Sequence, residues 1–217
     1  MARAVVDIMT ISARHNILMR LRTAGAPRHL PPSGQAPASI VEPAQSLETC
    51  RDRFVAEATA LGVECVVARS AAEVRARVAG LLRDATVLSW DAAELPYEIG
   101  GTLTHATWGH SPRAEQAAAD VGLTGCDAAI AETGSLAMIS APGRSRIVSL
   151  LPPIHVAIVR SEDLMFSMGE FFARRQDRLA TAASCTVISG PSRTADIELT
   201  LTLGIHGPGR IAVIVGP

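Results

Sequence analysis

The sequence from 185 to 198 is Cys185-Thr186-Val187-Ile188-Ser189-Gly190-Pro191-Ser192-Arg193-Thr194-Ala195-Asp196-Ile197-Glu198. Its first four residues form a short apolar run that is typical of a buried strand, and Gly190-Pro191 ends the run with a turn. Asp196 and Glu198 then have the spacing of acids in the first turn of a helix, where carboxylates favour the positive end of the helix dipole. The stretch therefore predicts a strand, a turn and the start of a helix, which Ser192 or Thr194 could cap.

The same stretch predicts an anion-binding site. Backbone N–H groups at a helix start can face an anion, and the planar guanidinium of Arg193 can hold a carboxylate or a phosphate. The remaining substrate-binding candidates of this stretch are Gly190, Ser192, Thr194 and Asp196. A tight, well-capped turn with a surface salt bridge explains the same residues without a ligand. The sequence allows both interpretations.

Strands and helices alternate along most of the chain. Apolar runs predict strands at 63–67, 86–90, 126–131, 135–139, 155–159, 185–188 and 211–215. Helices are expected over 47–61, 70–83, 112–120 and 163–178. Because most strand segments are continuously apolar, they indicate an α/β fold with a mostly parallel sheet covered by helices on both faces. The segments 126–131 and 135–139 are joined too closely for parallel neighbours and predict an antiparallel hairpin.

The first 44 residues differ from the rest of the chain. The apolar positions between Ala2 and Leu21 predict a helix, and seven Gly and Pro residues between 23 and 43 predict an irregular arm. We therefore expect an N-terminal helix and Pro-rich arm over 1–44, followed by one α/β domain over 45–217.

Composition and charge exclude several classes of partner. The net charge of the 217-residue chain is −1, and no basic block is present, which argues against nucleic acid. No apolar run approaches the roughly 20 residues of a membrane span, and the N-terminus lacks the pattern of a signal peptide, so we expect a cytoplasmic protein. The four cysteines, at 50, 65, 126 and 185, lack the close spacing of zinc or iron–sulfur ligands. We expect this chain to bind no metal and no cofactor.

The ends of the predicted strands supply the candidates for chemistry. In an open parallel sheet, ligands bind beyond the carboxyl ends of the strands. Trp90-Asp91 and the turn Glu132-Thr133-Gly134 follow such strands, and Arg144 and Arg146 are either loop charges or a second anion contact. Glu132 is a candidate base or nucleophile, with a solvated turn acid as the alternative.

His206 is the second catalytic candidate, because it follows Arg193 closely in the chain and lies in a turn before the last apolar run. Each candidate turn contains glycine and adjoins an apolar run, and a parallel sheet gathers such turns at one edge. We therefore expect one pocket to be lined by Glu132, Thr133, Arg193, Thr194 and His206.

Four motifs resemble the lactate-utilisation (LUD) domain family in order and spacing. They are Ala131-Glu132-Thr133-Gly134-Ser135-Leu136, Ser149-Leu150-Leu151-Pro152-Pro153-Ile154-His155-Val156-Ala157, the stretch from Ser189 to Glu198, and Gly204-Ile205-His206-Gly207-Pro208. The resemblance implies a fold like that of ribose-5-phosphate isomerase, glucosamine-phosphate deaminase and CoA-transferases. It also implies a place in a system that oxidises L-lactate to pyruvate with two iron–sulfur partner proteins. The short member of the family, which this chain resembles most, has no cluster.

Two alternatives to that function stay open. The turn Glu132-Thr133-Gly134 also resembles the Glu-x-Gly turn that presents the nucleophilic glutamate of CoA-transferases. This similarity implies a stand-alone transferase or isomerase that acts on a small anionic substrate, either a CoA ester or a sugar phosphate. The other alternative is a structural subunit with no chemistry of its own. A homo-oligomer is compatible with all of these functions.

Overall fold

The computed structural model describes residues 2–24, 45–103, 105–195 and 201–217. Contacts divide the chain into two units, 1–39 and 40–217. The first unit contains the predicted N-terminal helix, α1 (Ala2–Ala24). Most of the Pro-rich segment lies outside the described residues. No helix of the described part is long and apolar enough to cross a membrane.

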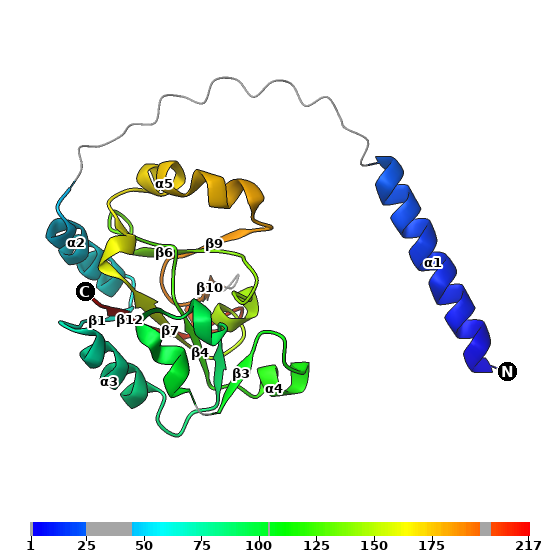
Figure 1. Ribbon diagram of the computed structural model, residues 1–217, viewed down its shortest axis with the longest axis horizontal. Helices are drawn as coiled ribbons and strands as arrows, with labels where there is room; N and C mark the ends of the chain where they lie inside the picture. Colours follow the sequence, from blue (N-terminus) through cyan, green and yellow to red (C-terminus); the bar gives the residue numbers. More distant parts are fainter. Residues whose placement is uncertain (1, 25–44, 104, 196–200) are drawn as a thin grey trace, which may run out of the picture. The chain divides into compact units, whose positions relative to one another are not determined.

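The second unit is built on a parallel sheet (Figure 1). In the described residues this sheet has six strands in the order β1-β12-β7-β4-β2-β3, and every neighbouring pair is parallel. The mostly parallel sheet predicted from the apolar runs is therefore confirmed. The strands are β1 (Glu64–Val67), β2 (Val87–Ser89), β3 (Ala106–Trp108), β4 (Val121–Thr124), β7 (Ile154–Val159) and β12 (Arg210–Val215).

A second, four-stranded sheet has the order β8-β5-β6-β9. It contains the predicted hairpin, in which β5 and β6 pair antiparallel with Ala128 opposite Ala137 and Ile130 opposite Ser135. The sequence did not predict that this hairpin belongs to a separate sheet. The strands are β5 (Ala128–Ile130), β6 (Ser135–Ile139), β8 (Leu164–Met165) and β9 (Cys185–Ile188).

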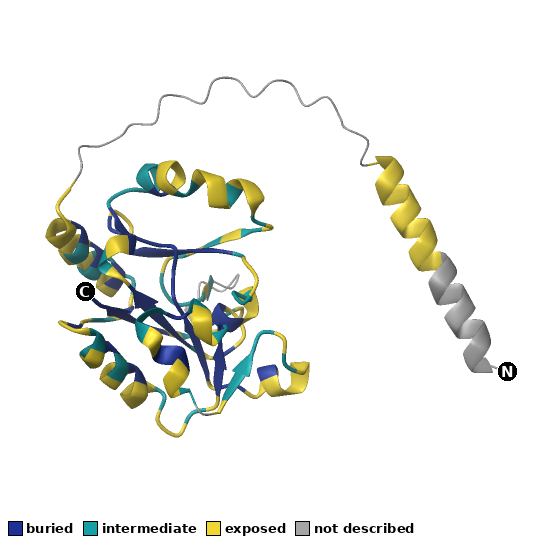
Figure 2. Ribbon diagram, viewed as in Figure 1, coloured by how far each residue is buried: buried dark blue, intermediate teal, exposed yellow. Residues whose placement is uncertain are grey.

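The second sheet separates two hydrophobic clusters, which explains why β5 and β6 are continuously buried (Figure 2). One set of alternating residues, Ala129, Ala131, Leu136 and Met138, packs into the main core with β7 and β12. The intervening residues pack on the other face against Phe171 of α5 (Met168–Thr181): Ala128, Ile130, Ala137 and Ile139. Both faces of the hairpin are thus buried, and its polar side chain, Ser135 of β6, is hydrogen-bonded to Thr133 Oγ1. The buried strand predicted at 185–188 is wrong, because β9 lies at the edge of this sheet with Cys185 and Val187 exposed.

The helices begin where polar side chains satisfy their first N–H groups. Ser46 Oγ accepts a hydrogen bond from Thr49 N at the start of α2 (Leu47–Ala60). Ser70 Oγ accepts from Glu73 N at the start of α3 (Ala71–Leu81), and Glu73 accepts in turn from Arg69 N. A short helix, α4 (Arg113–Ala117), follows β3. The other short helical turns are η1 (Ala92–Glu94), η2 (Pro96–Thr102), η3 (Arg146–Ser149) and η4 (Ser161–Asp163).

Two predicted helix starts are wrong. The helix expected from Asp163 begins at Met168, because Leu164–Met165 pairs with β5 as strand β8 and Ser167 caps the helix. The helix start expected after Gly190-Pro191 is also replaced by a strand. β10 (Arg193–Ala195) pairs antiparallel with β11 (Leu201–Leu203). Asp196 and Glu198 lie outside the described residues.

Candidate functional site

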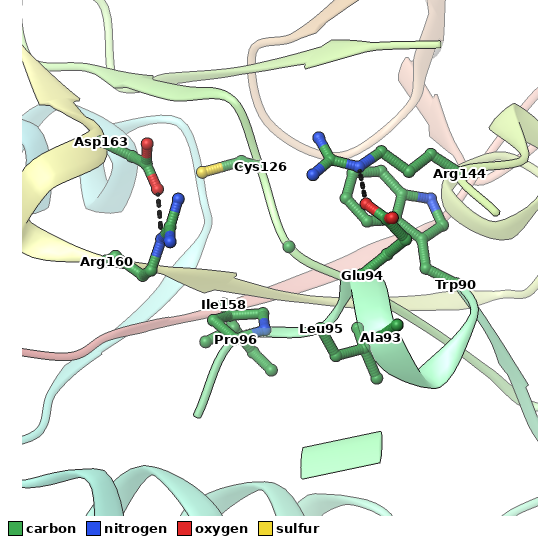
Figure 3. Close-up of a pocket in the computed structure, with 11 residues that line it drawn as sticks. Trp90, Ala93, Glu94, Leu95, Pro96, Cys126, Arg144, Ile158, Arg160 and Asp163 are labelled. Carbon is green, nitrogen blue, oxygen red and sulfur yellow. Dashed lines mark hydrogen bonds and ion pairs between the residues drawn. The ribbon is translucent and has the colours of Figure 1, made fainter. Parts of the chain in front are cut away.

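A cavity of about 130 Å³ lies at the carboxyl edge of the six-stranded sheet (Figure 3). Trp90 follows β2 directly, Gly125 and Cys126 follow β4, and Ile158 and Arg160 mark the end of β7. This edge is where ligands bind in open parallel sheets. Residues of η1, η2 and η4, together with the linker between η1 and η2 and the loop after β6, complete the lining: Ala93, Glu94, Leu95, Pro96, Arg144 and Asp163.

Arg144 is held in one orientation by three neighbours. Its Nε donates to Glu94 Oε2 at 2.5 Å, and its Nη1 donates to Asp127 Oδ1 at 2.8 Å. The Cζ atom lies 5.1 Å from the centroid of the Trp90 ring, which is a cation–π contact. Gly143 allows this loop to approach η1, because it has a φ of +76° and a Cβ at this position would lie 3.1 Å from both Asp91 Oδ2 and Glu94 Cγ. The guanidinium is therefore a pre-oriented cation at the cavity.

A second arginine lines the opposite side of the cavity. Figure 3 shows Arg160 and Asp163 on one side, Arg144 and Glu94 on the other, and Cys126 between them. Arg160 Nε donates to Asp163 Oδ2 at 2.8 Å, and its Nη1 lies 2.8 Å from Glu162 Oε1. Both of these contacts use nitrogens of the guanidinium that would otherwise be free to bind an anion.

Two buried carboxylates anchor these arginines to α5. The Asp127 side chain is 1% exposed and accepts hydrogen bonds from Arg144 Nη1 and, at 2.6 Å, from Ile139 N; Arg178 Nη1 lies 2.5 Å from its Oδ1 in an ion pair. Asp163 is similarly buried, and Arg175 Nη2 donates to its Oδ1 at 2.7 Å. Buried carboxylates need paired cations, so each cavity arginine belongs to an ion-pair group that includes an arginine of α5. Arg175 Nε, which donates to Asp127 O at 3.1 Å, joins the two groups.

Cys126 contributes a neutral thiol to the cavity. Burial raises the pKa of this thiol well above its ordinary value, and the nearby carboxylates of Asp163 and Asp127 raise it further. The thiolate is the nucleophilic and metal-binding form of cysteine. Cys126 therefore lines the cavity at neutral pH as a small, weakly polar side chain.

The predicted site residues gather elsewhere, at the C-terminal end of α2. A Cβ on Gly134 would overlap the backbone nitrogen of Ala58, and a Cβ on Gly190 would lie 3.0 Å from Leu61 Cβ. The Oγ of Ser135 receives a hydrogen bond from Thr133 Oγ1 at 2.8 Å and lies 2.7 Å from Ser189 Oγ. The structure thus brings the turns at 132–134 and 189–190 together.

Arg193 binds the end of the same helix. Its Nη2 donates to Leu61 O at 2.5 Å, so the guanidinium caps a C-terminal carbonyl of α2. Ser192 N donates a hydrogen bond to Pro208 O, and Ser192 O accepts one from Gly204 N. These two backbone hydrogen bonds place the turn that contains His206 beside this segment. These contacts fit the structural interpretation of the stretch.

The predicted catalytic residues have exposed side chains. Glu132 and His206 are both exposed, and Thr194 is half-buried. Trp90 and Arg144 line the 130 Å³ cavity, whereas the described residues of the predicted pocket do not: Glu132, Thr133, Gly134, Gly190, Ser192, Arg193, Thr194 and His206. Asp196 lies outside the described residues. Their roles in binding or catalysis stay predictions.

Sequence reasoning missed most of the cavity. Trp90 was expected at a strand end and Arg144 was one of two loop cations, but Glu94, Cys126, Arg160 and Asp163 were not candidates. The sequence does contain one signal that points to the cavity: Asp127 is a carboxylate between apolar residues, at the start of a buried strand. A carboxylate at such a position needs a cationic partner, which is the role of Arg144.

Comparisons with known proteins agree with this fold. The LUD domain matches residues 51–215. Lactate utilization protein C of Shouchella clausii is 38% identical over 143 residues, which cover 60% of this chain and 62% of that protein. Lactate utilization protein C of an Exiguobacterium species is 40% identical over 101 residues, or 45% of this chain and 44% of that protein.

A solved structure is similar as well. The crystal structure of a DUF162 family protein from Deinococcus radiodurans superposes with a TM-score of 0.66 at 25% identity, and the match covers 80% of this chain and all of that one. The chain spans roughly half the length of the curated relatives it matches. Since the domain match extends over most of the sequence, this chain belongs to the LUD domain family.

Proposed function

We propose that this chain is the cluster-free subunit of a system that oxidises L-lactate to pyruvate together with iron–sulfur partner proteins. The observation that carries the proposal is its similarity, within the LUD domain, to proteins named lactate utilization protein C. Because the chain spans only part of those relatives, the similarity supports a role in lactate utilisation and leaves the chemistry to be argued from its residues.

The oxidation removes two electrons and two protons from lactate, as its hydroxyl-bearing carbon becomes a carbonyl. An iron–sulfur cluster that accepts such electrons is held by several cysteine thiolates. Here the four cysteines lie in α2, in β1, after β4 and in β9. No group of three or more His, Cys, Asp or Glu side chains in the described residues could hold a metal ion.

The placement of the cysteines also supports clusters on the partners. The thiolates of one cluster have to lie close together. Cys50, Cys65, Cys126 and Cys185 come from four separate segments of the fold, and no three of the described His, Cys, Asp and Glu side chains form a metal-binding group. The proposal therefore assigns electron transfer to the partner subunits and binding of a small anion to this chain.

The test is reconstitution of L-lactate oxidation. This chain is purified alone and together with iron–sulfur proteins encoded beside its gene, and L-lactate-dependent reduction of a dye is measured, with D-lactate as the control substrate. We expect dye reduction only when all subunits are present. Equal dye reduction by this chain alone, or by the partners without it, would refute the proposal. Turnover of a CoA ester or a sugar phosphate by the chain alone would instead favour the transferase or isomerase alternative.

A further inference from the structure

We infer that the cavity at the carboxyl edge of the sheet binds a small monocarboxylate through Arg144, and that Glu94 is an internal carboxylate which this ligand displaces. The location and the ligand charge follow from the structure. The choice of a 2-hydroxy or 2-oxo acid within the class of monocarboxylates rests on the proposed function.

The size of the cavity restricts the ligand. At about 130 Å³ it lies well below the roughly 300–1,000 Å³ of pockets that enclose drug-sized ligands. An acid the size of lactate or pyruvate fits this volume. A CoA ester or a sugar phosphate would have to leave most of its atoms outside it.

Arg144 supplies the recognition of a carboxylate. Its position is fixed by Trp90 and by Asp127, so little side-chain entropy is lost when an anion binds. No described residue is hydrogen-bonded to its Nη2. An arginine with an available edge binds a carboxylate through two parallel hydrogen bonds.

The two acids on Arg144 differ in how firmly they are held. Asp127 is buried, and Arg178 and Ile139 N also bind it, so it is a permanent partner. The side chain of Glu94 is 31% exposed, and Arg144 is its only hydrogen-bond partner among the described residues. Glu94 therefore occupies the place of a ligand carboxylate without further anchors, and an incoming acid can replace it.

The rest of the lining distinguishes Arg144 from the second guanidinium. Arg160 is bound through its Nε and Nη1, as Arg144 is, but its side chain is 47% exposed whereas that of Arg144 is 18% exposed. A carboxylate is therefore better sheltered from water at Arg144. The lining is mostly polar, with a smaller aliphatic part from Leu95, Pro96 and Ile158 and a neutral thiol from Cys126 (Figure 3). Its two guanidiniums are matched by the carboxylates of Glu94 and Asp163, so a monocarboxylate fits this charge better than a dicarboxylate.

The test is direct binding of pyruvate and L-lactate to the full chain, measured by isothermal titration calorimetry. Arg144→Lys keeps the charge but loses the planar fork, and it should weaken binding by about tenfold or more. Glu94→Gln removes the internal competitor and should strengthen binding by about threefold or more. Arg144→Lys should fold, because Arg178 and Ile139 N still hold Asp127; thermal melting checks this point.

The exposed pair Arg210–Glu64 offers matched controls. Arg210 Nε donates to Glu64 Oε1 at 2.6 Å, outside the cavity lining. Arg210→Lys and Glu64→Gln should leave both affinities unchanged. The inference is overturned if neither the wild-type chain nor Glu94→Gln binds the acids, or if the Arg144 and Arg210 variants bind them equally.

The same variants separate this inference from the proposed function. If Arg144→Lys loses pyruvate binding and the complete system never oxidises lactate, the cavity assignment stands and the proposed function fails. If the system with Arg144→Lys oxidises lactate at the wild-type rate, the proposed function stands and the cavity assignment fails.

Discussion

His155 is a fully buried side chain on β7, and its environment determines its protonation. Its Nε2 lies 2.9 Å from Thr124 Oγ1, while Nδ1 has no hydrogen-bond partner among the described residues. Burial lowers the pKa of this imidazole from 6.5 to about 4. His155 is therefore neutral at pH 7 and has a structural role between β7 and β4.

The lowered pKa of His155 predicts a pH-dependent stability. Above pH 6.5 the contribution of His155 to stability is fully present, and it is lost as the pH falls toward 4, because the unfolded chain binds a proton that the folded chain does not. The loss over this window is about 3 kcal/mol. Urea unfolding of His155→Gln should therefore show a shallower decline in stability between pH 6.5 and 4 than the wild type. The exposed His110→Gln should keep the wild-type decline, and equal slopes in all three proteins would contradict the prediction.

At the scale of the element, α5 packs on the second sheet through one aromatic side. Phe171 is fully buried against β5 and β6, whereas Phe172 is 53% exposed. The two rings are 5.3 Å apart. The same helix supplies Arg175 and Arg178 to the buried carboxylates, so its packing also positions the cavity arginines.

Truncation of these neighbouring aromatics should have unequal effects. Phe171→Ala should lower the free energy of unfolding by about 3 kcal/mol or more, because it leaves a cavity under α5. Phe172→Ala removes a half-exposed ring and its contact with Phe171, which is worth about 1 kcal/mol or less. Chemical denaturation measures both values. Equal losses would show that α5 does not pack as described.

The end of α2 offers a test of the two interpretations of Arg193. Arg193→Ala should cost about 1 kcal/mol of stability, because Leu61 O loses its donor. Pyruvate binding should be unchanged, since Arg193 does not line the cavity. Weaker pyruvate binding at unchanged stability would instead support the anion site predicted from the sequence.

At the scale of the whole molecule, the parallel character of the sheet and the hairpin could be predicted because their signals are local. Apolar runs mark β1, β2, β7 and β12, and the short link at 132–134 determines the antiparallel pair. β3 and β4 were not predicted, because they are three and four residues long and contain Thr or Gly. The second sheet could not be predicted, because β5 and β6 have the same continuous apolar pattern whether sheets or helices cover them. The two-residue strand β8 (Leu164–Met165) was not predicted either, because its apolar residues also fit the apolar positions of the helix expected over 163–178.

The cavity was only partly predictable because its contacts are distant in the sequence. Because ligands bind beyond the carboxyl ends of parallel strands, Trp90, which follows β2, could be placed at the edge of the sheet where the cavity lies. Arg144, however, pairs with Glu94 across 50 positions and with Asp127 across 17. Periodicity reports neighbours along one element and carries no information on such pairs.

The position of β12 has a consequence for how the domain reaches its native state. β12 lies between β1 and β7, and its Arg210 bonds to Glu64 across 146 positions. Without β12, β1 has no strand to pair with in the described sheet, and β7 keeps an open hydrogen-bonding edge. Closing so long a loop makes folding slow. Until β12 docks, the exposed edge of β7 is a template for pairing between chains, so the yield of folded protein should depend on protein concentration during refolding.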